Sequence, residues 1–362
     1  MARIVTVVGA RPQFIKAAAL SPVLRSSFDE TLIHTGQHYD YQMSEAMFDQ
    51  LQIPHPDYNL NVGSGTHARQ TAAMLMGIED ILISDPPEML LTYGDTNSTL
   101  AAALAAAKLN IPVAHVEAGL RSFNRKMPEE LNRVVTDDLS ALLFCPTDQA
   151  VENLRCEGIT TGVFLVGDVM CDALRRYERL ATQRYSEGPP QITGLFAEPA
   201  LPPAWYLATI HRAENTQDEQ KLGQIIEAFE QLDIPVLFVT HPRTRPLVKR
   251  LFAQKEYANT LFIEPVGYLE MLYLSARARK IITDSGGLQK EAYMLGVPCV
   301  TVREQTEWVE TLYDGWNILV DATSSAVVAG VVGEATDESC RRELYGDGHA
   351  AERITACLTE WL

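Results

Sequence analysis

The chain has 362 residues, of which 46% are hydrophobic, and a formal net charge of −17. This length exceeds what one hydrophobic core usually supports, so we expect two domains. The charge argues against nucleic acid or an anionic membrane surface as partner, and no apolar run reaches membrane-spanning length. Six scattered cysteines without C-x-x-C spacing, and a start, MARIVTVVGARPQ, without the blocks of a signal peptide, predict a cytoplasmic protein with reduced thiols.

Apolar strand-like runs alternate with helical patterns in the first part of the chain. The expected strands are Ile4–Val8, Thr31–His34, Met89–Tyr93, Pro112–Val116, Leu143–Cys145 and Val163–Val166. The helices between them include one led by Pro12, the alanine-rich Thr96–Lys108 and one near Glu129–Leu142. This βαβα order predicts a parallel sheet with helices on both faces.

The alternation restarts after a segment rich in Pro and Gly, about 183–204, which is typical of a linker. The expected strands of this second part are Tyr206–Ile210, Val236–Thr240, Thr260–Ile263, Lys280–Thr283 and Pro298–Val302, and residues 347–362 form a last helix. The prediction is an α/β protein with two doubly wound domains, 1–167 and 168–346, and a cleft between them.

Ligands of open α/β sheets bind beyond the carboxyl ends of the strands, so the residues that follow each strand are informative. They are Gly9-Ala-Arg-Pro, Gly36-Gln-His, Gly94-Asp-Thr-Asn, Glu117-Ala-Gly-Leu-Arg, His211-Arg, His241-Pro-Arg and Asp284-Ser-Gly-Gly. Nearly every expected strand ends in Gly, His or a charged residue. That regularity indicates a ligand site.

The stretch TDSGGLQKEA, from Thr283, predicts an anion site. Asp284 or Ser285 can cap the following helix, while Gly286 and Gly287 leave backbone N–H groups bare at the positive end of the helix dipole. A capped helix behind a tight turn is the simpler alternative.

Two groups of cations could clamp a diphosphate together with that turn. Arg11 and Lys16 flank the start of the first helix, where Pro12 holds Arg11 extended. His241 begins the second group, which continues with Arg243 and Arg245. The alternative for Arg11 and Lys16 is two solvated surface cations.

Three carboxylates, Asp95, Glu117 and Glu129, are expected to crowd one sheet edge. Like charges brought close raise one another's pKa, which is a common way to keep an acid and a base ready. Each also has a structural alternative: Asp95 as an N-cap, Glu117 as a partner of Arg121, and Glu129 as an i, i+4 partner of Arg133.

The chain offers no clear metal site. His115 and Glu117 share a face at the end of a strand but lack a third ligand at suitable spacing, and Gly36 separates His34 from His38. We therefore expect no metal.

Several motifs occur in order and through both domains: GARPQFIKAA, TGQHYD, YGDTNSTLAAALAAAKLNIPVAHVEAGLRSFNRKMPEELNR, HRAEN, TDSGGLQKEA, GVPCVTVRE, TEWVE and YGDG. Together they resemble the non-hydrolysing UDP-N-acetylglucosamine 2-epimerases. The resemblance implies two Rossmann-like domains in the GT-B-like arrangement of many glycosyltransferases, with the last helix packed back on the first domain. It also implies a UDP-sugar substrate, a homodimer, no nicotinamide and no required metal.

The same resemblance implies roles for residues of these motifs. The active-site cations would be Arg11 and Lys16, and the acid/base carboxylates Asp95, Glu117 and Glu129. His211 would lie by the departing phosphate, and Ser285, Gly286 and Gly287 would hold the diphosphate. Glu291 would bind the ribose hydroxyls, and Arg133 and His241 would complete the nucleotide pocket.

The chain departs from the best-studied members at three places. Gln13 replaces Glu, Tyr39-Asp40 replaces an Arg-Glu pair near the site of an activating second substrate, and TEWVE replaces TERPE at Thr306–Glu310. The TEWVE form resembles relatives that act on UDP-2,3-diacetamido-2,3-dideoxyglucuronic acid.

Inverting C2 of a 2-acetamido sugar is difficult because its hydrogen is not beside a carbonyl. No G-x-G-x-x-G follows a strand, which argues against oxidation by NAD. The alternative expels UDP from C1 while a base removes the C2 proton, giving a glycal to which UDP adds back. Cations and a helix N-terminus would stabilise the leaving group, and carboxylates would move the protons.

Three competing hypotheses can be separated by experiment. A glycosyltransferase of the same fold needs an acceptor, a nucleotide-sugar sensor shows no exchange of the C2 hydrogen, and a hydrolysing epimerase accumulates UDP.

Overall fold

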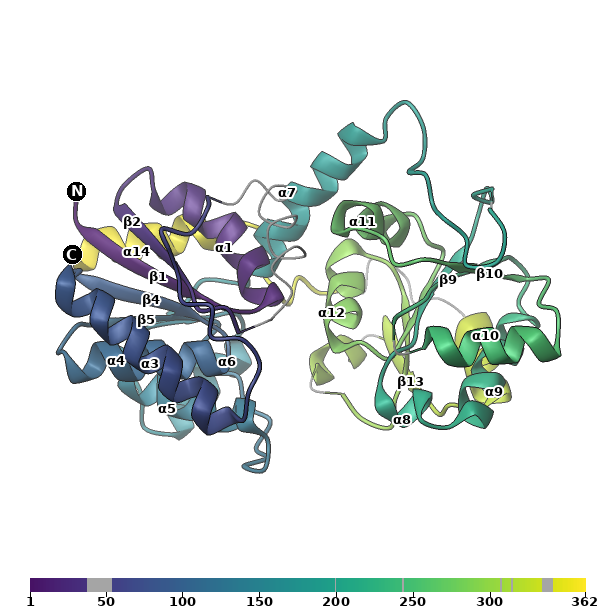
Figure 1. Cartoon of the computed structure of the whole chain (residues 1–362). Helices are drawn as coiled ribbons and strands as arrows, with labels where there is room; N and C mark the ends of the chain where they lie inside the picture. Colours follow the sequence, from purple (N-terminus) through teal and green to yellow (C-terminus); the bar gives the residue numbers. More distant parts are fainter. Residues whose placement is uncertain (38–53, 199, 243, 307, 314, 334–340) are drawn as a thin grey trace. The chain divides into compact units, whose positions relative to one another are not determined.

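The computed structural model describes residues 1–37, 54–198, 200–242, 244–306, 308–313, 315–333 and 341–362. The chain packs into two compact units, which Figure 1 shows as separate α/β bodies. Unit 1 holds Met1–Arg176 with Leu344–Leu362, and unit 2 holds Tyr177–Glu343. Packing thus divides the chain within helix α7 (Val169–Arg184) and at 343/344, whereas the expected domain limits were 167/168 and 346/347.

Unit 1 is built on a seven-stranded parallel sheet in the order β3-β2-β1-β4-β5-β6-β7. Its strands are β1 (Arg3–Val8), β2 (Asp29–His34), β3 (Tyr58–Asn59), β4 (Met89–Tyr93), β5 (Val113–Val116), β6 (Leu142–Cys145) and β7 (Val163–Leu165). Its helices are α1 (Arg11–Leu24), α3 (His67–Ser84), α4 (Asn97–Lys108), α5 (Pro128–Leu139), α6 (Asp148–Cys156), the first half of α7 and α14 (Ala350–Trp361).

Burial explains why the central strands are continuous apolar runs. Every residue of β4, β5 and β6 is buried, as expected where helices cover both faces of a parallel sheet. Five of the six alanines of α4 are buried as well, and their small side chains allow α3 and α5 to pack closely beside it. Thr96 caps α4 by accepting from Thr99 N at 3.3 Å, so the alternative of Asp95 as N-cap is wrong.

The tail helix α14 lies against α1 in unit 1 (Figure 1). Asp172 of α7 accepts from Ala351 N at 2.8 Å in the first turn of α14, and Arg353 donates to the carbonyl of Val166 at 3.1 Å. The last residues of the sequence therefore stabilise the same unit as the first.

Unit 2 is built on a six-stranded parallel sheet in the order β10-β9-β8-β11-β12-β13. Its strands are β8 (Tyr206–Thr209), β9 (Val236–Val239), β10 (Thr260–Ile263), β11 (Ile281–Thr283), β12 (Cys299–Val302) and β13 (Asn317–Val320). Its helices are the second half of α7, α8 (Ala213–Thr216), α9 (Glu219–Phe229), α10 (Arg245–Gln254), α11 (Tyr268–Ala276), α12 (Gly286–Leu295), the 3₁₀ turn η1 (Val309–Leu312) and α13 (Ser324–Val332).

The linker-like segment 183–204 does more than connect elements. Leu195 N donates to Phe262 O and Glu264 N to Thr193 O, both at 2.8 Å, so the segment pairs antiparallel with the edge strand β10. The pairing protects an edge that would otherwise expose unpaired backbone groups. With two parallel sheets and helices on their faces, the expected α/β fold class is confirmed.

Candidate active site

The predicted site residues of each unit lie at, or next to, the point where its strand order reverses. In unit 1 the chain passes from β1 to β2 on one side and later to β4 on the other, so the reversal falls between β1 and β4. In unit 2 it falls between β8 and β11. Such switch points leave a crevice beyond the carboxyl ends of the strands, where α/β proteins bind ligands.

The turn from β1 to α1 is held by a residue that sequence reasoning treated only as a family difference. Gln13 accepts from Gly9 N (2.8 Å) and Ala10 N (3.1 Å) and donates to the carbonyl of Tyr93 (2.7 Å). An amide satisfies both kinds of partner, whereas an ionised glutamate could not donate to that carbonyl. Arg11 is exposed at the first position of α1.

Lys16 of α1 and Glu117 at the end of β5 form an ion pair. Both side chains are almost buried, with exposed fractions of 7% and 12%. Glu117 has a φ of +73°, a left-handed conformation that costs energy for a residue with a side chain. Gly94 faces this pair, because a Cβ on it would lie 3.1 Å from Glu117 Oε2. The alternative of Lys16 as a solvated surface cation is wrong.

Asp95, which follows β4, pairs with Arg133 of α5, with Arg133 Nη2 2.5 Å from Asp95 Oδ2. Burial raises the pKa of Asp95, and the charge of Glu117 adds to this, against the opposing effects of Arg133 and Lys16. Burial opposes the charge on Arg133, but Asp95 and its other carboxylate partners outweigh it and raise the pKa of this guanidinium. Asp95 and Glu117 are therefore coupled electrostatically, as expected.

Glu129 and Glu130 are neighbours in the first turn of α5 but differ in exposure and in contacts. Glu129 is exposed, whereas Glu130 is 1% exposed. Arg133 pairs with Glu130 at 3.0 Å, so the alternative of an i, i+4 pair with Glu129 is wrong. The Glu130 carboxylate also accepts from Ser122 N at 2.8 Å and Phe123 N at 2.9 Å, which fixes the loop before α5. Sequence reasoning missed this role.

Arg121 was the alternative partner of Glu117, and that pairing is also wrong. Its guanidinium contacts Asp137 at 2.7 Å and Glu157 at 2.7 Å, and its side chain is 1% exposed. In unit 1 the structure thus brings together Lys16 with Glu117 and Asp95 with Arg133, and it leaves Glu129 exposed.

The glycine turn of unit 2 is an open helix N-terminus. Ser285 caps α12 by accepting from Leu288 N at 3.4 Å, while Gly286 and Gly287 form its first turn. Gly287 is exposed and Glu291 lies four residues further on, so both share one face of the helix. Phosphate oxygens at the amides and a ribose at Glu291 would therefore lie on the same side.

Asp284 does not cap the helix but organises the neighbouring strand end. It is fully buried and accepts from His211 N (3.0 Å), Arg212 N (2.9 Å) and the Asn215 side chain (3.1 Å). His211 Nδ1 also lies 3.4 Å from Asp284 Oδ1. Sequence reasoning considered Asp284 only as a cap, because its contacts come from a strand seventy residues away in the chain.

The ring of His211 lies 5.2 Å from that of His241, which follows β9. These two histidines and the turn at Ser285 therefore follow three adjacent strands, β9, β8 and β11. Arg243 of the expected second cation group lies outside the described residues, and the charge of Arg245 is paired with Glu264.

The TEWVE segment is tied to helix α12. Gln289 accepts from Thr306 Oγ1 at 2.8 Å, and the Lys290 ammonium lies 4.2 Å from the centre of the Trp308 ring. Glu307 and the departure at Tyr39-Asp40 lie outside the described residues.

The family model described as UDP-N-acetylglucosamine 2-epimerase matches residues 23–359. The chain belongs to this family. The resemblance drawn from the motifs is therefore confirmed.

Relatives of the epimerase family match along their full length. The chain is 50% identical to the "UDP-N-acetylglucosamine 2-epimerase homolog" of Methanococcus maripaludis, over 98% of this chain and 99% of that one. It is 46% identical to UDP-2,3-diacetamido-2,3-dideoxy-D-glucuronate 2-epimerase of Pseudomonas aeruginosa, over 99% of both chains. The crystal structure of Methanocaldococcus jannaschii UDP-GlcNAc 2-epimerase in complex with UDP-GlcNAc and UDP superposes with a TM-score of 0.82, at 40% identity over 99% of both chains.

The described residues contain no cluster of three or more His, Cys, Asp or Glu side chains placed to bind a metal. Within the same part of the chain, no helix combines the length and apolarity needed to cross a membrane.

Proposed function

We propose that this chain is a non-hydrolysing UDP-N-acetylglucosamine 2-epimerase, an isomerase that interconverts UDP-GlcNAc and UDP-ManNAc. The reaction eliminates UDP to give a glycal and then adds UDP back, with the C2 proton returned on the opposite face. One observation carries the proposal. Two carboxylate–cation pairs lie at the switch point of one sheet, and an open helix N-terminus lies at the switch point of the other.

Unit 1 would perform the proton transfers. Asp95 and Glu117 are coupled, and each has its own cation: Asp95 pairs with Arg133 while burial raises its pKa, and Glu117 pairs with Lys16. Two carboxylates with different environments suit one acid and one base. Glu129, exposed at the start of α5, would be the third participant, and Arg11 would stabilise the charge that develops on the diphosphate.

Unit 2 would bind the nucleotide. The amides of Gly286 and Gly287 and the positive end of α12 suit a diphosphate, and Glu291 on the same helix face suits the ribose. His211 and His241, at neighbouring strand ends, would complete this half. The family resemblance adds Arg133 to the residues of the nucleotide pocket. The reaction is redox-neutral overall, so it consumes no nicotinamide.

The test is to incubate the protein with UDP-GlcNAc alone in D₂O and follow it by proton NMR. We expect the C2 epimer to form with deuterium at C2 and without net release of UDP. Turnover only after an acceptor is added would indicate a glycosyltransferase, and accumulating UDP would indicate a hydrolysing enzyme. Binding without exchange would indicate a sensor.

The second candidate is the same reaction on UDP-2,3-diacetamido-2,3-dideoxyglucuronic acid. It is supported by 46% identity to the Pseudomonas enzyme of that name, beside 50% to the Methanococcus homolog, and by the TEWVE form of the segment that is bonded to α12. Both candidate reactions release and recapture UDP, so the mechanism does not separate them. A comparison of kcat/KM for the two UDP-sugars shows which one the protein prefers.

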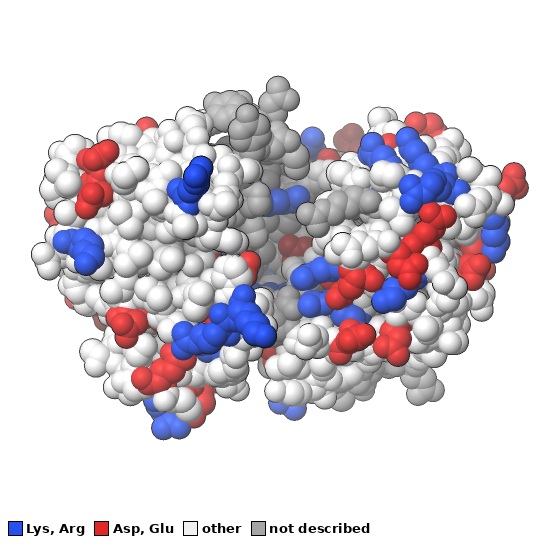
Figure 2. Space-filling model, turned by 60° about the horizontal axis from the view of Figure 1, so that its bottom comes forward, with Lys and Arg blue, Asp and Glu red and all other residues white. Residues whose placement is uncertain are grey.

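The proposal includes a cytoplasmic homodimer. Support for self-association comes from α3, where Met76 and Ile83 are each 60% exposed and lie two turns apart on one face. Figure 2 shows wide areas without charged side chains on the surface of unit 1, although the chain carries a net charge of −17. Light scattering should report a dimer for the wild type and a monomer for Met76→Glu; a dimer in both would exclude this face.

A further inference from the structure

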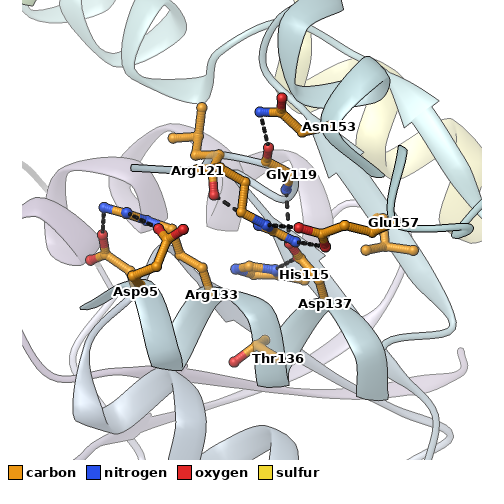
Figure 3. A network of polar contacts seen from close by, with 12 residues as sticks. Asp95, His115, Gly119, Arg121, Arg133, Thr136, Asp137, Asn153 and Glu157 are labelled. Atoms are coloured by element: carbon orange, nitrogen blue, oxygen red, sulfur yellow. Dashed lines mark hydrogen bonds and ion pairs between the residues drawn. The ribbon is translucent and has the colours of Figure 1, made fainter. Parts of the chain in front are cut away.

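Behind the carboxylates of unit 1 lies a buried polar network centred on His115 (Figure 3). His115 belongs to β5 and is completely buried. Its Nε2 lies 2.7 Å from the carbonyl oxygen of Gly94, and its Nδ1 lies 2.6 Å from Asp137 Oδ1. A carbonyl oxygen can only accept, so Nε2 carries a hydrogen.

Asp137 is held as an ionised acceptor, which determines the other nitrogen of the ring. Asp137 Oδ2 accepts from Arg121 Nη1 at 2.7 Å and from Gly119 N at 3.0 Å. An ionised carboxylate can only accept, so Nδ1 of His115 carries a hydrogen as well. The ring is then an imidazolium between two acceptors.

The positive and negative charges of this network are equal in number, and neither Asp95 nor Glu117 is needed to balance them. His115 and Arg121 face Asp137, and Arg121 also forms a two-pronged contact with Glu157 at 2.8 and 2.7 Å. Two cations are thus matched by two carboxylates, as a buried network requires. Asp95 and Glu117 stay outside it, with Arg133 and Lys16 as their own partners.

The network fixes the backbone on both sides of the site. On one side, His115 Nε2 contacts the carbonyl of Gly94, the residue directly before Asp95. On the other side, Asp137 holds Gly119 N, two residues after Glu117, and Asn153 holds the carbonyl of the same glycine at 2.9 Å. Gly94, Glu117 and Gly119 have φ angles of +63°, +73° and +79°. A left-handed Glu117 persists only where its surroundings hold it, and these contacts do so.

We propose that His115 is a positioning residue that carries two ring hydrogens and locks the turns bearing Asp95 and Glu117 into one geometry. The proposal rests on the proposed function for its effect on turnover, but not for the protonation state of the ring. A neutral ring would lose either the Gly94 contact or the Asp137 contact. One turn would then be released while the substrate-binding residues of unit 2 stayed in place.

The protonation state is tested on the wild type by ¹⁵N NMR of protein labelled at histidine. The His115 signals are identified by their loss in His115→Gln. We expect both ring nitrogens to be protonated at pH 7.5. One unprotonated ring nitrogen would overturn the proposal, whatever the protein is found to catalyse.

The positioning role is tested by two substitutions that divide the contacts of the ring. His115→Gln keeps a donor that reaches toward Gly94, whereas His115→Asn keeps one only toward Asp137. We expect the Asn variant to lower kcat about 10- to 100-fold with KM within about twofold, and the Gln variant to recover at least part of the loss. An equal drop in kcat in the two variants, or a change in KM with kcat unaltered, would overturn the positioning role.

A matched control comes from another buried network of unit 1. Glu30 of β2 is buried and accepts from Thr6 Oγ1 at 2.7 Å and Arg25 Nε at 2.8 Å. Glu30→Gln should lower stability but leave kcat near the wild-type value. If it lowers kcat as much as His115→Asn does, His115 acts only through stability. Absence of any epimerisation by the wild type would instead refute the proposed function.

Discussion

Replacing Glu130 by Gln should destabilise unit 1, whereas the same change at its neighbour Glu129 should not. The Glu130 carboxylate accepts from two backbone N–H groups, the Ser122 hydroxyl and the Arg133 guanidinium, at 2.8 to 3.0 Å. A glutamine offers one acceptor oxygen and turns an NH₂ group toward the donors that remain. Hydrogen bonds to charged groups contribute about 1.5–3 kcal/mol each, so losing one and weakening the others should cost about 2–4 kcal/mol.

The exposed Glu129 provides the control, because a surface substitution changes stability by about 0.5 kcal/mol or less. The Glu129→Gln substitution should instead lower turnover by about 10²-fold or more, as expected when a proton-transfer group is lost. Urea-dependent hydrogen exchange, read by mass spectrometry on peptides of β4 and β5, measures the unfolding free energy of unit 1 in each variant.

The stability difference also has a defined dependence on pH. Burial would raise the pKa of Glu130, but the hydrogen bonds from Ser122, Phe123 and Arg133 outweigh it and bring this pKa below 4.5. A carboxylate with a lowered folded-state pKa stabilises the fold above its unfolded-state pKa, and this contribution is lost as the pH falls through the folded-state value. The gap between wild type and Glu130→Gln should therefore close in acid. A Glu130→Gln variant as stable as the wild type at pH 7 would refute the reasoning.

Three further predictions concern other parts of the chain. Asp284→Ala leaves the buried donors at Arg212 N and its neighbours unpaired, so calorimetry should show UDP affinity weakened about tenfold or more; unchanged affinity would show that the strand end keeps its shape without them. Burial raises the pKa of Asp172 to about 6 from 3.8, so stability should rise by about 1 kcal/mol as the pH falls from 7 to 5, and Asp172→Asn should lose this rise in urea titrations. Lys280→Met removes the ammonium that donates to three carbonyls at the end of α13, so the unfolding free energy of unit 2 should fall by about 1–3 kcal/mol. Denaturant titrations measure this, and an unchanged unfolding free energy would contradict the prediction.

The fold was predictable because its signals are local and repeated. The strands Met89–Tyr93 and Thr260–Ile263 have the bounds that their apolar runs indicated, and other strand ends differ by one or two residues. Strand β13 and helix α13 were not anticipated, because short half-buried runs after Trp316 carry no clear period. The pairing of 183–204 with β10 depends on a distant edge and could not be read locally.

The candidate site was predictable in its residue types and not in its partners. Strand-end positions named Asp95 and Glu117, because parallel strands bring their carboxyl ends to one edge. Partner choice failed where spacing along a helix suggested a nearby pair. Arg133 contacts Asp95, 38 positions away in the chain, and not Glu129. Tertiary geometry decides such pairs, and spacing alone does not.

Whether a charged residue is buried or exposed could not be predicted from the sequence either. Glu129 and Glu130 are adjacent and chemically identical, and only the loop that folds over Glu130 distinguishes them. The contacts of His115 likewise depend on distant partners, the carbonyl of Gly94 after β4 and a carboxylate from α5.

The central claim is that UDP leaves C1 of the sugar and returns to it. It is tested most directly with UDP-GlcNAc that carries ¹⁸O between C1 and the β-phosphorus. Reversible cleavage of the C1–O bond predicts that the label moves into the non-bridging oxygens of the β-phosphate while the C2 epimer forms. Epimerisation with the label retained in the bridge would contradict elimination, and with it the role assigned to the glycine turn of α12.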